Sequence, residues 1–271
     1  MDIEPIQRLN KDLRQAAATL SATEARFLVD AYYQMQRDRI RAAHQARTLA
    51  ESNEPHLMLA WLFDNTGVLE RNIKSALGHY SKHNPVGAWA ESIVGIGPVI
   101  SAGLLAHIDI RKAPTVGHIW RFAGLDPTIT WKEGQKRPWN GALKRLCWII
   151  GESFTKQSGH PKDFYGKIYV ARKVQEEAKN AEHAFADQAA TALSTKRWKR
   201  DTQTKAAYEQ GLLPQARIHL RAQRYAVKLF LSHWQHVAYR YHHGTIPPKP
   251  YVIEHLGHAH EIQVPNYPWA D

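Results

Sequence analysis

Residues 92–108 read SIVGIGPVISAGLLAHI, and this stretch decides the fold of the middle of the chain. Gly95 and Gly97 permit a tight turn and leave backbone N–H groups uncovered by side chains. Pro98 suits the first turn of a helix, where its missing N–H costs no hydrogen bond. Apolar residues then recur at helical spacing up to Ile108. The stretch predicts a helix–hairpin–helix, in which the N-terminus of the second helix could hold a phosphate.

The same turn supplies the first candidate site residues. Backbone amides at such a hairpin grip the phosphates of one strand and read little of the base sequence, sometimes with a bound monovalent cation. A plain packing corner between two helices is the alternative explanation of the same pattern. If the turn binds phosphate, the residues involved are those of the turn and two cations that follow the second helix: Val94, Gly95, Ile96, Gly97, Arg111 and Lys112.

The chain is strongly basic. Its 271 residues include 36 Lys and Arg against 25 Asp and Glu, which gives a formal net charge of +11. A clustered surplus of this size indicates a polyanionic partner, above all nucleic acid, although it can also serve solubility alone. Nucleic acid is therefore the expected partner.

The lack of an apolar membrane segment and of paired cysteines excludes several classes of protein. No run approaches the roughly 18 apolar residues of a membrane-spanning helix, and residues 1–15 lack a signal-peptide pattern, so no membrane partner is expected. The one cysteine, Cys147, lies in an apolar run, which predicts a core residue. A single cysteine excludes internal disulfides and Cys-rich zinc sites, and it fits a cytoplasmic location.

The periodicity predicts a mainly all-α protein with three regions. Residues 1–84 are expected to form a helical hairpin or coiled coil. Residues 85–162 are expected to form the helix–hairpin–helix domain. Residues 163–271 combine long helices and a basic cluster with an irregular tail that is rich in Pro and His.

The first region is expected to mediate protein contacts. Helices are predicted over residues 3–19, from a capping box at Ser21 and Glu24 onward, and over about 55–83. The two longer helices should form a hairpin that dimerises or docks a partner protein. One apolar face of the second helix carries Phe27, Leu28, Ala31, Tyr32 and Met35.

The other two regions also read as helices. A boundary is expected at Asn84-Pro85, and the only candidate strand is 128–131, inside an irregular loop. Further helices are predicted over residues 115–125, 142–158, roughly 163–195, and 215–243.

A second group of candidate site residues lies in and after that loop, in the stretch WKEGQKRPWNGALKR (131–145). Cations neutralise phosphates, and indole rings can stack on unpaired bases. The alternative is a solvated loop whose tryptophans fold onto the core. The cations are Lys132, Lys136, Arg137, Lys144 and Arg145, interleaved with Trp131 and Trp139.

The third group lies between residues 191 and 240, a segment that contains ten Lys or Arg and only two acids. A cluster comes first and a stripe at helical spacing follows. Such a stripe is either an ordinary solvated face or part of a continuous binding surface. The cluster is Arg197, Lys199 and Arg200, and the stripe is Arg217, Arg221, Arg224 and Lys228.

No metal site is predicted. Zinc could take three histidines, but packing and hydrogen bonding explain these histidines better, since two of them share a face of a core helix. No cofactor is therefore expected beyond a possible monovalent cation at the hairpin. The histidines are His233, His236, His242, His243, His255, His258 and His260.

No catalytic residue can be named from the sequence. No acids stand at strand ends, as a metal-dependent nuclease core requires, and no nucleophile elbow is present. Asp30, Asp38, Asp64 and Glu70 are expected to face solvent on helices. The sequence predicts a binding protein more clearly than a catalyst. A divalent metal is expected only if the protein is a catalyst.

Residues 85–175 resemble the C-terminal domain of the insertion sequence 110/116/902 family of transposases. In that domain a helix–hairpin–helix precedes an A-G-L-x-P turn, a loop, and a helix that opens G-N-x-x-L-R-R. VKLFLSHW (227–234) and KPYVIEHLGH (249–258) are more weakly similar to tails of mobile-element proteins. Ala123, Gly124, Leu125 and Pro127 match the turn, and Asn140, Leu143, Lys144 and Arg145 match the helix start, with Trp139 in place of the glycine.

The chain departs from this family in both catalytic elements. Family members are similar to RuvC-type nucleases at the N-terminus, where this chain has a helical hairpin. The family's loop carries a Ser-Gly whose serine is the presumed nucleophile, where this chain reads WKEG (131–134). The resemblance thus implies a DNA-binding relative without autonomous transposition.

Two other functions stay open. One is an active recombinase or nuclease subunit that uses a displaced hydroxyl (Ser153, Ser158 or Thr130) or a histidine-bound metal. The other is an RNA-binding or scaffold protein, because relatives of this family work with a guide RNA.

Overall fold

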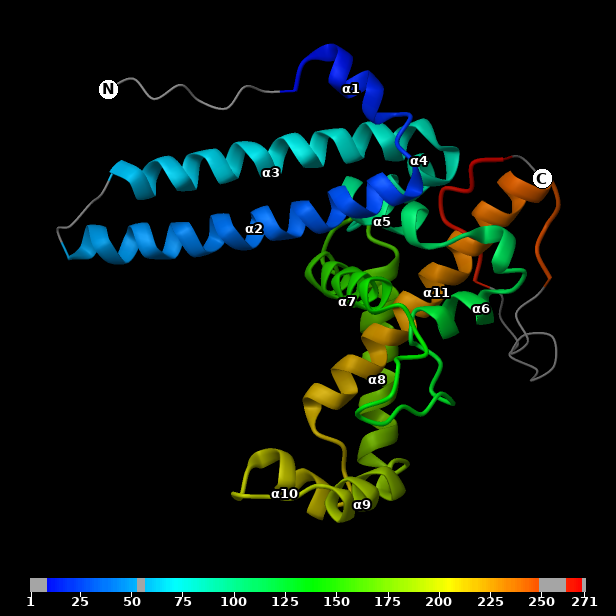
Figure 1. Cartoon of the computed structure of the whole chain (residues 1–271). Helices are drawn as coiled ribbons and strands as arrows, with labels where there is room; N and C mark the ends of the chain where they lie inside the picture. Colours follow the sequence, from blue (N-terminus) through cyan, green and yellow to red (C-terminus); the bar gives the residue numbers. More distant parts are fainter. Residues whose placement is uncertain (1–8, 53–56, 249–261, 270–271) are drawn as a thin grey trace.

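The computed structural model describes residues 9–52, 57–248 and 262–269 (Figure 1). This part of the chain contains eleven α-helices, one 3₁₀ helix and no strand, which confirms the predicted all-α fold. The one candidate strand, 128–131, does not form. Asp126 Oδ1 accepts hydrogen bonds from the Thr128 N–H at 2.9 Å and the Thr128 hydroxyl at 2.7 Å. This local turn competes with strand pairing.

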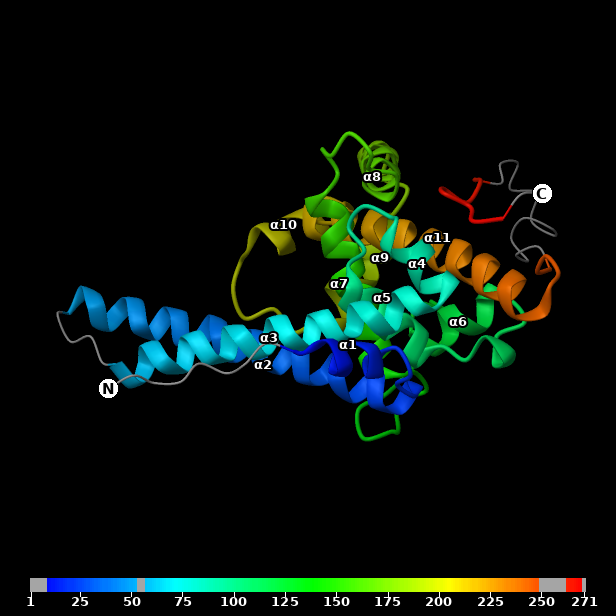
Figure 2. The ribbon, with the colours of Figure 1, turned by 90° about the horizontal axis from the view of Figure 1, so that it is seen from above.

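The N-terminal helices form the predicted hairpin. α1 (Lys11–Ala17) precedes α2 (Ala22–Glu51) and α3 (Leu57–His83). Ser21 and Glu24 close the expected capping box, with the Ser21 N–H donating to Glu24 Oε2 at 2.7 Å. Figures 1 and 2 show α2 and α3 running together and projecting well beyond the rest of the molecule.

Two expectations about this hairpin are wrong. Glu70 is buried rather than solvent-facing, because the Arg39 guanidinium on α2 pairs with its carboxylate. Phe27 is 73% exposed instead of sharing the packed face. Val29 and Tyr32 make the contact with α3 and α5, and Phe27 lies about 200° around the helix from Val29.

The middle region contains two helices joined by a tight turn, in the order expected of the helix–hairpin–helix. α4 (Pro85–Glu91) begins at the predicted boundary, where Asn84 Oδ1 accepts from the Val86 N–H at 2.9 Å. The turn at Gly95 leads into α5 (Pro98–His107). The short 3₁₀ helix η1 (Ile110–Lys112) and α6 (Val116–Phe122) follow.

The C-terminal region is more broken than the sequence pattern predicts. α7 (Gly141–Lys156) is followed by α8 (Tyr165–Ala181) and α9 (Ala186–Thr195), where one helix over 163–195 was expected. That expectation is wrong because His183 adopts a left-handed conformation, with φ of 57°, and interrupts the helix. α10 (Gln203–Glu209) was not anticipated, whereas α11 (Gln215–His243) matches its prediction.

The largest apolar core surrounds α11. Phe230 on α11 packs edge-on against Phe154 of α7, with ring centroids 5.5 Å apart, and Phe154 stacks on Tyr165 of α8 at 4.9 Å. Cys147 is buried in the same core, as predicted, and burial raises the pKa of its thiol to about 12. Residues from both 85–162 and 163–271 contribute to this core.

His233 is a packed and hydrogen-bonded core histidine. Its Nδ1 lies 2.7 Å from the Tyr165 hydroxyl and its Nε2 lies 2.8 Å from the Ile262 carbonyl oxygen. Among the described residues no group of three or more His, Cys, Asp or Glu could hold a metal ion. His255, His258 and His260 lie outside the described residues.

Within the same ranges no helix is both long and apolar enough to cross a bilayer.

Acid should destabilise the fold through His233. Burial lowers the pKa of His233 to about 4, from an ordinary value of 6.5. As the pH falls from 6.5 to 4, the unfolded chain binds a proton that the folded chain does not. The free energy of unfolding should then drop by up to about 1.4 kcal/mol per pH unit. Urea denaturation across this range should show the slope, and His233→Gln should make it shallower.

His79→Gln is the control for this experiment, because His79 is exposed on α3. It should leave the acid slope of the native chain unchanged. An equal slope in His233→Gln and the native chain would show that another group is responsible.

Two phenylalanine truncations should separate the core from the surface. Phe154 is fully buried, so Phe154→Ala should lower the free energy of unfolding by about 3–5 kcal/mol. Phe27 is 73% exposed, so Phe27→Ala should change it by less than about 0.5 kcal/mol. Urea denaturation of both variants tests the pair, and equal losses would contradict the core described here.

Candidate nucleic-acid interface

The predicted site residues fall in four separate places. The glycine turn lies against the C-terminal half of α7, and a basic loop lies beside the N-terminal half of that helix. Arg111 and Lys112 line a cleft. The cluster of 197–200 lies between α9 and α10, at the far end of α8 from α4 and α5 (Figure 1).

The glycine turn has a packed side and an open side. Gly95 has a φ of +95°, and its carbonyl oxygen accepts from Ser153 Oγ at 2.6 Å. A Cβ placed on Gly95 would lie 3.3 Å from Phe154 Cδ1, and the next residue, Ile96, is buried. At Gly97, by contrast, a Cβ would meet nothing within 4 Å. The packing corner is therefore present, and phosphate binding at the open side stays a prediction.

Arg111 and Lys112 do not adjoin this turn. They follow the C-terminal end of α5, which has ten residues and so separates them from the turn by about 15 Å. Arg111 also has its own counter-ion, since its Nε and Nη2 donate to the two carboxylate oxygens of Asp109 at 2.9 and 3.1 Å. The hydrogen bond from Arg111 lowers the pKa of Asp109 below its usual value.

Four cations from three segments meet beside α7, and we call them the α7–α11 cluster. They are Arg137 of the loop, Lys144 of α7, and Arg224 and Lys228 of α11. Burial lowers the pKa of Lys144, and the positive charges of Arg224 and Arg137 lower it further. Burial also lowers the pKa of Lys228, against the opposing effect of Asp126.

The α7–α11 cluster is not neutralised by ion pairs. None of its four members takes part in a salt bridge within the described residues. Burial, followed by the charges of Arg221 and Arg217, lowers the pKa of Arg224 as well. Like charges held this close disfavour one another, so an anion placed among them would be stabilised.

Tryptophan rings support these cations. Lys144 Nζ lies 4.0 Å from the ring centre of Trp139, and Lys228 Nζ lies 4.0 Å from that of Trp120. Trp139 itself packs on Gly124, where a Cβ would come within 2.8 Å of the indole. Both Trp139 and Trp131 are half-buried, and Trp131 Nε1 donates to the Gln135 carbonyl at 2.8 Å. The rings act mainly as platforms under cations.

Other predicted cations are placed outside the cluster. Arg145 turns toward α2, with its Cζ 5.2 Å from the Tyr33 ring. Arg221 pairs with the buried Glu176 at 2.6 Å, so the expected stripe on α11 is divided between an ion pair and the cluster. Lys132 and Lys136 are exposed in the same loop as Arg137, and Arg197, Lys199 and Arg200 are exposed between α9 and α10.

Sequence reasoning missed two residues beside this surface. Trp120 supports Lys228 from a helix more than 100 positions earlier, and no sequence pattern joins the two. Trp148 is 57% exposed on α7, one helical turn after Lys144. Its i, i+4 spacing from Lys144 is the signal that could have placed it on this face.

The hydroxyls considered for catalysis have structural roles or lack a base. Ser153 Oγ donates to the Gly95 carbonyl, and Ser158 Oγ donates to the Thr155 carbonyl at 2.9 Å. Thr130 is exposed in the loop. In the hydrogen bonds of the described residues, none of the three contacts a histidine or a carboxylate that could act as its general base.

No protein-family model, curated protein or solved structure matches the chain. The resemblance to the insertion sequence 110/116/902 transposases therefore stays a prediction.

The two glycines of the turn should respond differently to the same change. Gly95→Ser forces a side chain into a left-handed conformation against α7, and should lower the free energy of unfolding by about 1–3 kcal/mol. Gly97→Ser enters open space and supplies a capping hydroxyl at the start of α5. It should change stability by less than about 0.5 kcal/mol. Urea denaturation compares them, and equal losses would contradict the packed and open sides.

Proposed function

We propose that this protein binds nucleic acid, with duplex DNA as the preferred partner, and does not itself catalyse strand transfer. The α7–α11 cluster carries the proposal. None of its four cations has an acid in ion-pair contact, and burial together with the charges of neighbouring cations lowers the pKa values of three of them. A phosphate backbone is the common biological ligand that supplies anionic charge over such an area.

The aromatic residues favour contact with a backbone over contact with bases. Trp139 and Trp120 each carry a lysine over the ring, so these faces are occupied by cations. Stacking platforms for single strands instead present open rings to successive bases. Binding through phosphates positions a duplex without reading its sequence, so little sequence preference is expected.

The resemblance of residues 85–175 to transposases supports DNA over RNA. On this proposal the chain is an accessory or domesticated relative of a mobile-element recombinase. Ser153 and Ser158 are engaged in bonds to backbone carbonyls, which supports a binding role for this region rather than a catalytic one. The open side of the turn at Gly97 would add a second backbone contact.

We also propose that the projecting α2–α3 hairpin joins two copies of the chain. Ile40, Leu57 and Leu62 are 45%, 83% and 38% exposed in its distal half. Exposed apolar side chains on a projecting element favour a protein contact. Light scattering of Leu57→Glu against the native chain should show a smaller mass for the variant.

Charge removal in the α7–α11 cluster should weaken binding to all duplexes alike. Lys144→Gln and Arg224→Gln each delete one phosphate contact. Each should reduce the slope of log affinity against log salt by about one. Fluorescence anisotropy with two unrelated duplexes over a salt series measures this.

Lys179→Gln is the matched control, because Lys179 is exposed in the last turn of α8. It should leave both affinity and slope unchanged. A loss confined to one DNA sequence, or an unchanged slope in the cluster variants, would contradict the proposal. Tighter binding to structured RNA than to duplex DNA at equal salt would show that RNA is the partner.

A further inference from the structure

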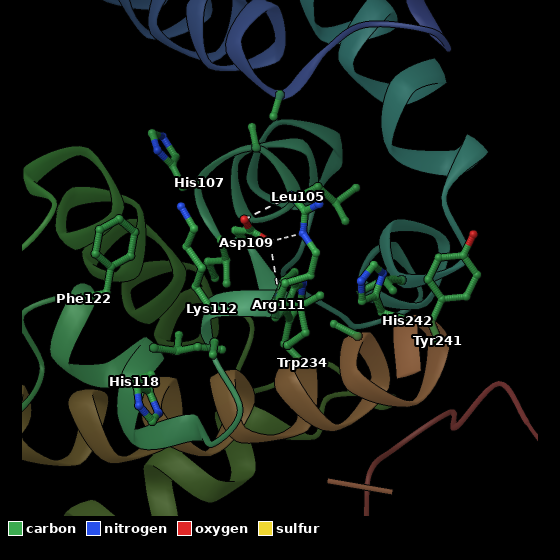
Figure 3. Close-up of a pocket in the computed structure, with 18 of the residues that line it drawn as sticks. Leu105, His107, Asp109, Arg111, Lys112, His118, Phe122, Trp234, Tyr241 and His242 are labelled. Carbon is green, nitrogen blue, oxygen red and sulfur yellow. Dashed lines mark hydrogen bonds and ion pairs between the residues drawn. The ribbon is translucent and has the colours of Figure 1, made fainter. Parts of the chain in front are cut away.

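A cleft of about 900 Å³ lies between the C-terminal end of α5, η1, α6 and the last turns of α11 (Figure 3). Its lining is largely apolar and includes Leu105, Ile110 and the buried Trp234. A volume of this size is at the upper end of ordinary ligand sites. It exceeds what a bare phosphate needs.

The cleft is also cationic. Four lining residues are Arg26, Arg111, Lys112 and Arg121, and Asp109 is the one acid among the residues that line it. Asp109 is engaged by Arg111. Lys112 and Arg121 form no salt bridge within the described ranges. Lys112 contributes to the lowered pKa of Asp109, and Arg121 to that of Asp126, but neither is held in an ion pair that would keep it from an anionic group in the cleft.

His107, at the C-terminal end of α5, lines this cleft and also a smaller cavity lined by Val29 and Arg145. His107 Nδ1 is buried and has no hydrogen-bond partner within the described residues. Burial, followed by the charge of Arg26, lowers the pKa of His107. Leaving such an atom unpaired costs free energy.

An exposed aromatic ring stands on each side. Phe122 of α6 is 42% exposed and Tyr241 of α11 is 50% exposed. In Figure 3 the Lys112 side chain lies between Phe122 and the Asp109–Arg111 pair, and Tyr241 lies on the opposite side of that pair. Unlike Trp139 and Trp120, Phe122 carries no cation over its ring among the described cation–aromatic contacts.

The cleft adjoins the α7–α11 cluster. The Phe122 carbonyl accepts from the Asn140 N–H at 2.8 Å, which joins the end of α6 to the start of α7. Pro138 of the basic loop lines the cleft. Trp120, two residues before Phe122, supports Lys228 of the cluster. A strand held at the cluster could therefore reach the cleft over α6.

We infer that the cleft binds one nucleotide, with its base against Phe122 and its phosphate at Lys112 and Arg121. The ring supplies the apolar and stacking surface, and the two cations supply the anion site. Such a nucleotide can be free or can be an unpaired residue of a bound strand. The second source rests on the proposed function, whereas the first does not.

Two probes separate these sources in the full-length protein. Calorimetry with deoxyadenosine monophosphate, deoxyadenosine and inorganic phosphate tests the free nucleotide, and the monophosphate should bind most tightly. Anisotropy with a duplex that carries one unpaired nucleotide, against the fully paired duplex, tests the strand. The unpaired nucleotide should improve affinity roughly tenfold, as expected for one stacked base.

Variants of the cleft should remove these gains. Phe122→Ala should abolish the roughly tenfold preference for the unpaired nucleotide, and Phe122→Tyr, which keeps a ring, should retain it. Lys112→Gln should weaken the binding of deoxyadenosine monophosphate but not the binding of deoxyadenosine. Val174→Ala is the matched control, because Val174 is 60% exposed on α8 and does not line the cleft. Both Phe122 and Lys112 are exposed, so the variants should fold.

Each outcome bears on the cleft independently of the cluster. A preference for the unpaired nucleotide, or monophosphate binding, that Phe122→Ala removes supports the inference. Monophosphate binding without duplex binding supports the cleft and contradicts the proposed function. Duplex binding with neither a preference nor monophosphate binding overturns the inference and leaves the proposed function intact. Monophosphate binding, or a preference for the unpaired nucleotide, that persists unchanged in Phe122→Ala also overturns the inference.

Discussion

The contact between Phe154, Tyr165 and Phe230 is the interaction on which the rest of the structure depends. It joins α7, α8 and α11 in one core, and α11 runs the length of that core. Because α7 and α11 are fixed against each other there, Arg224 lies near enough to Lys144 for its charge to lower the pKa of that lysine. The basic surface is therefore a consequence of apolar packing, since only the core outweighs the repulsion that the surface creates.

Aromatic rings offset part of the free-energy cost of holding these cations together. The attraction between a lysine ammonium and an indole face is worth about 0.5–2 kcal/mol, and it is larger where the lysine is more removed from water. Lys144 and Lys228 each have such a ring at 4.0 Å, so part of the cost of their partial burial is offset. Carboxylates would offset that cost more fully, but they would also repel phosphate. Tryptophan therefore stabilises the cations while leaving their charge available to a ligand.

Much of the fold follows from local sequence signals, whereas the site does not. The capping box at Ser21, the start of α4 after Asn84 and the span of α11 follow from short-range chemistry. The burial of Glu70 could not be predicted, because it depends on Arg39 of the facing helix. The break at His183 could not either, since a left-handed non-glycine residue leaves no periodic trace. Likewise, membership of the α7–α11 cluster depends on how distant segments cross.

The glycine turn shows why one motif supported two interpretations. Gly95 is required by its positive φ and by its contact with α7, so its presence is explained by packing alone. Gly97 has neither constraint, since its φ is −100° and the space beside it is open. A residue that the fold does not require to be glycine, placed at the start of a helix whose first amides face outward from the cap, is the better indicator of a ligand. In this turn the observed packing corner therefore depends on Gly95, and the prediction of phosphate binding depends on Gly97.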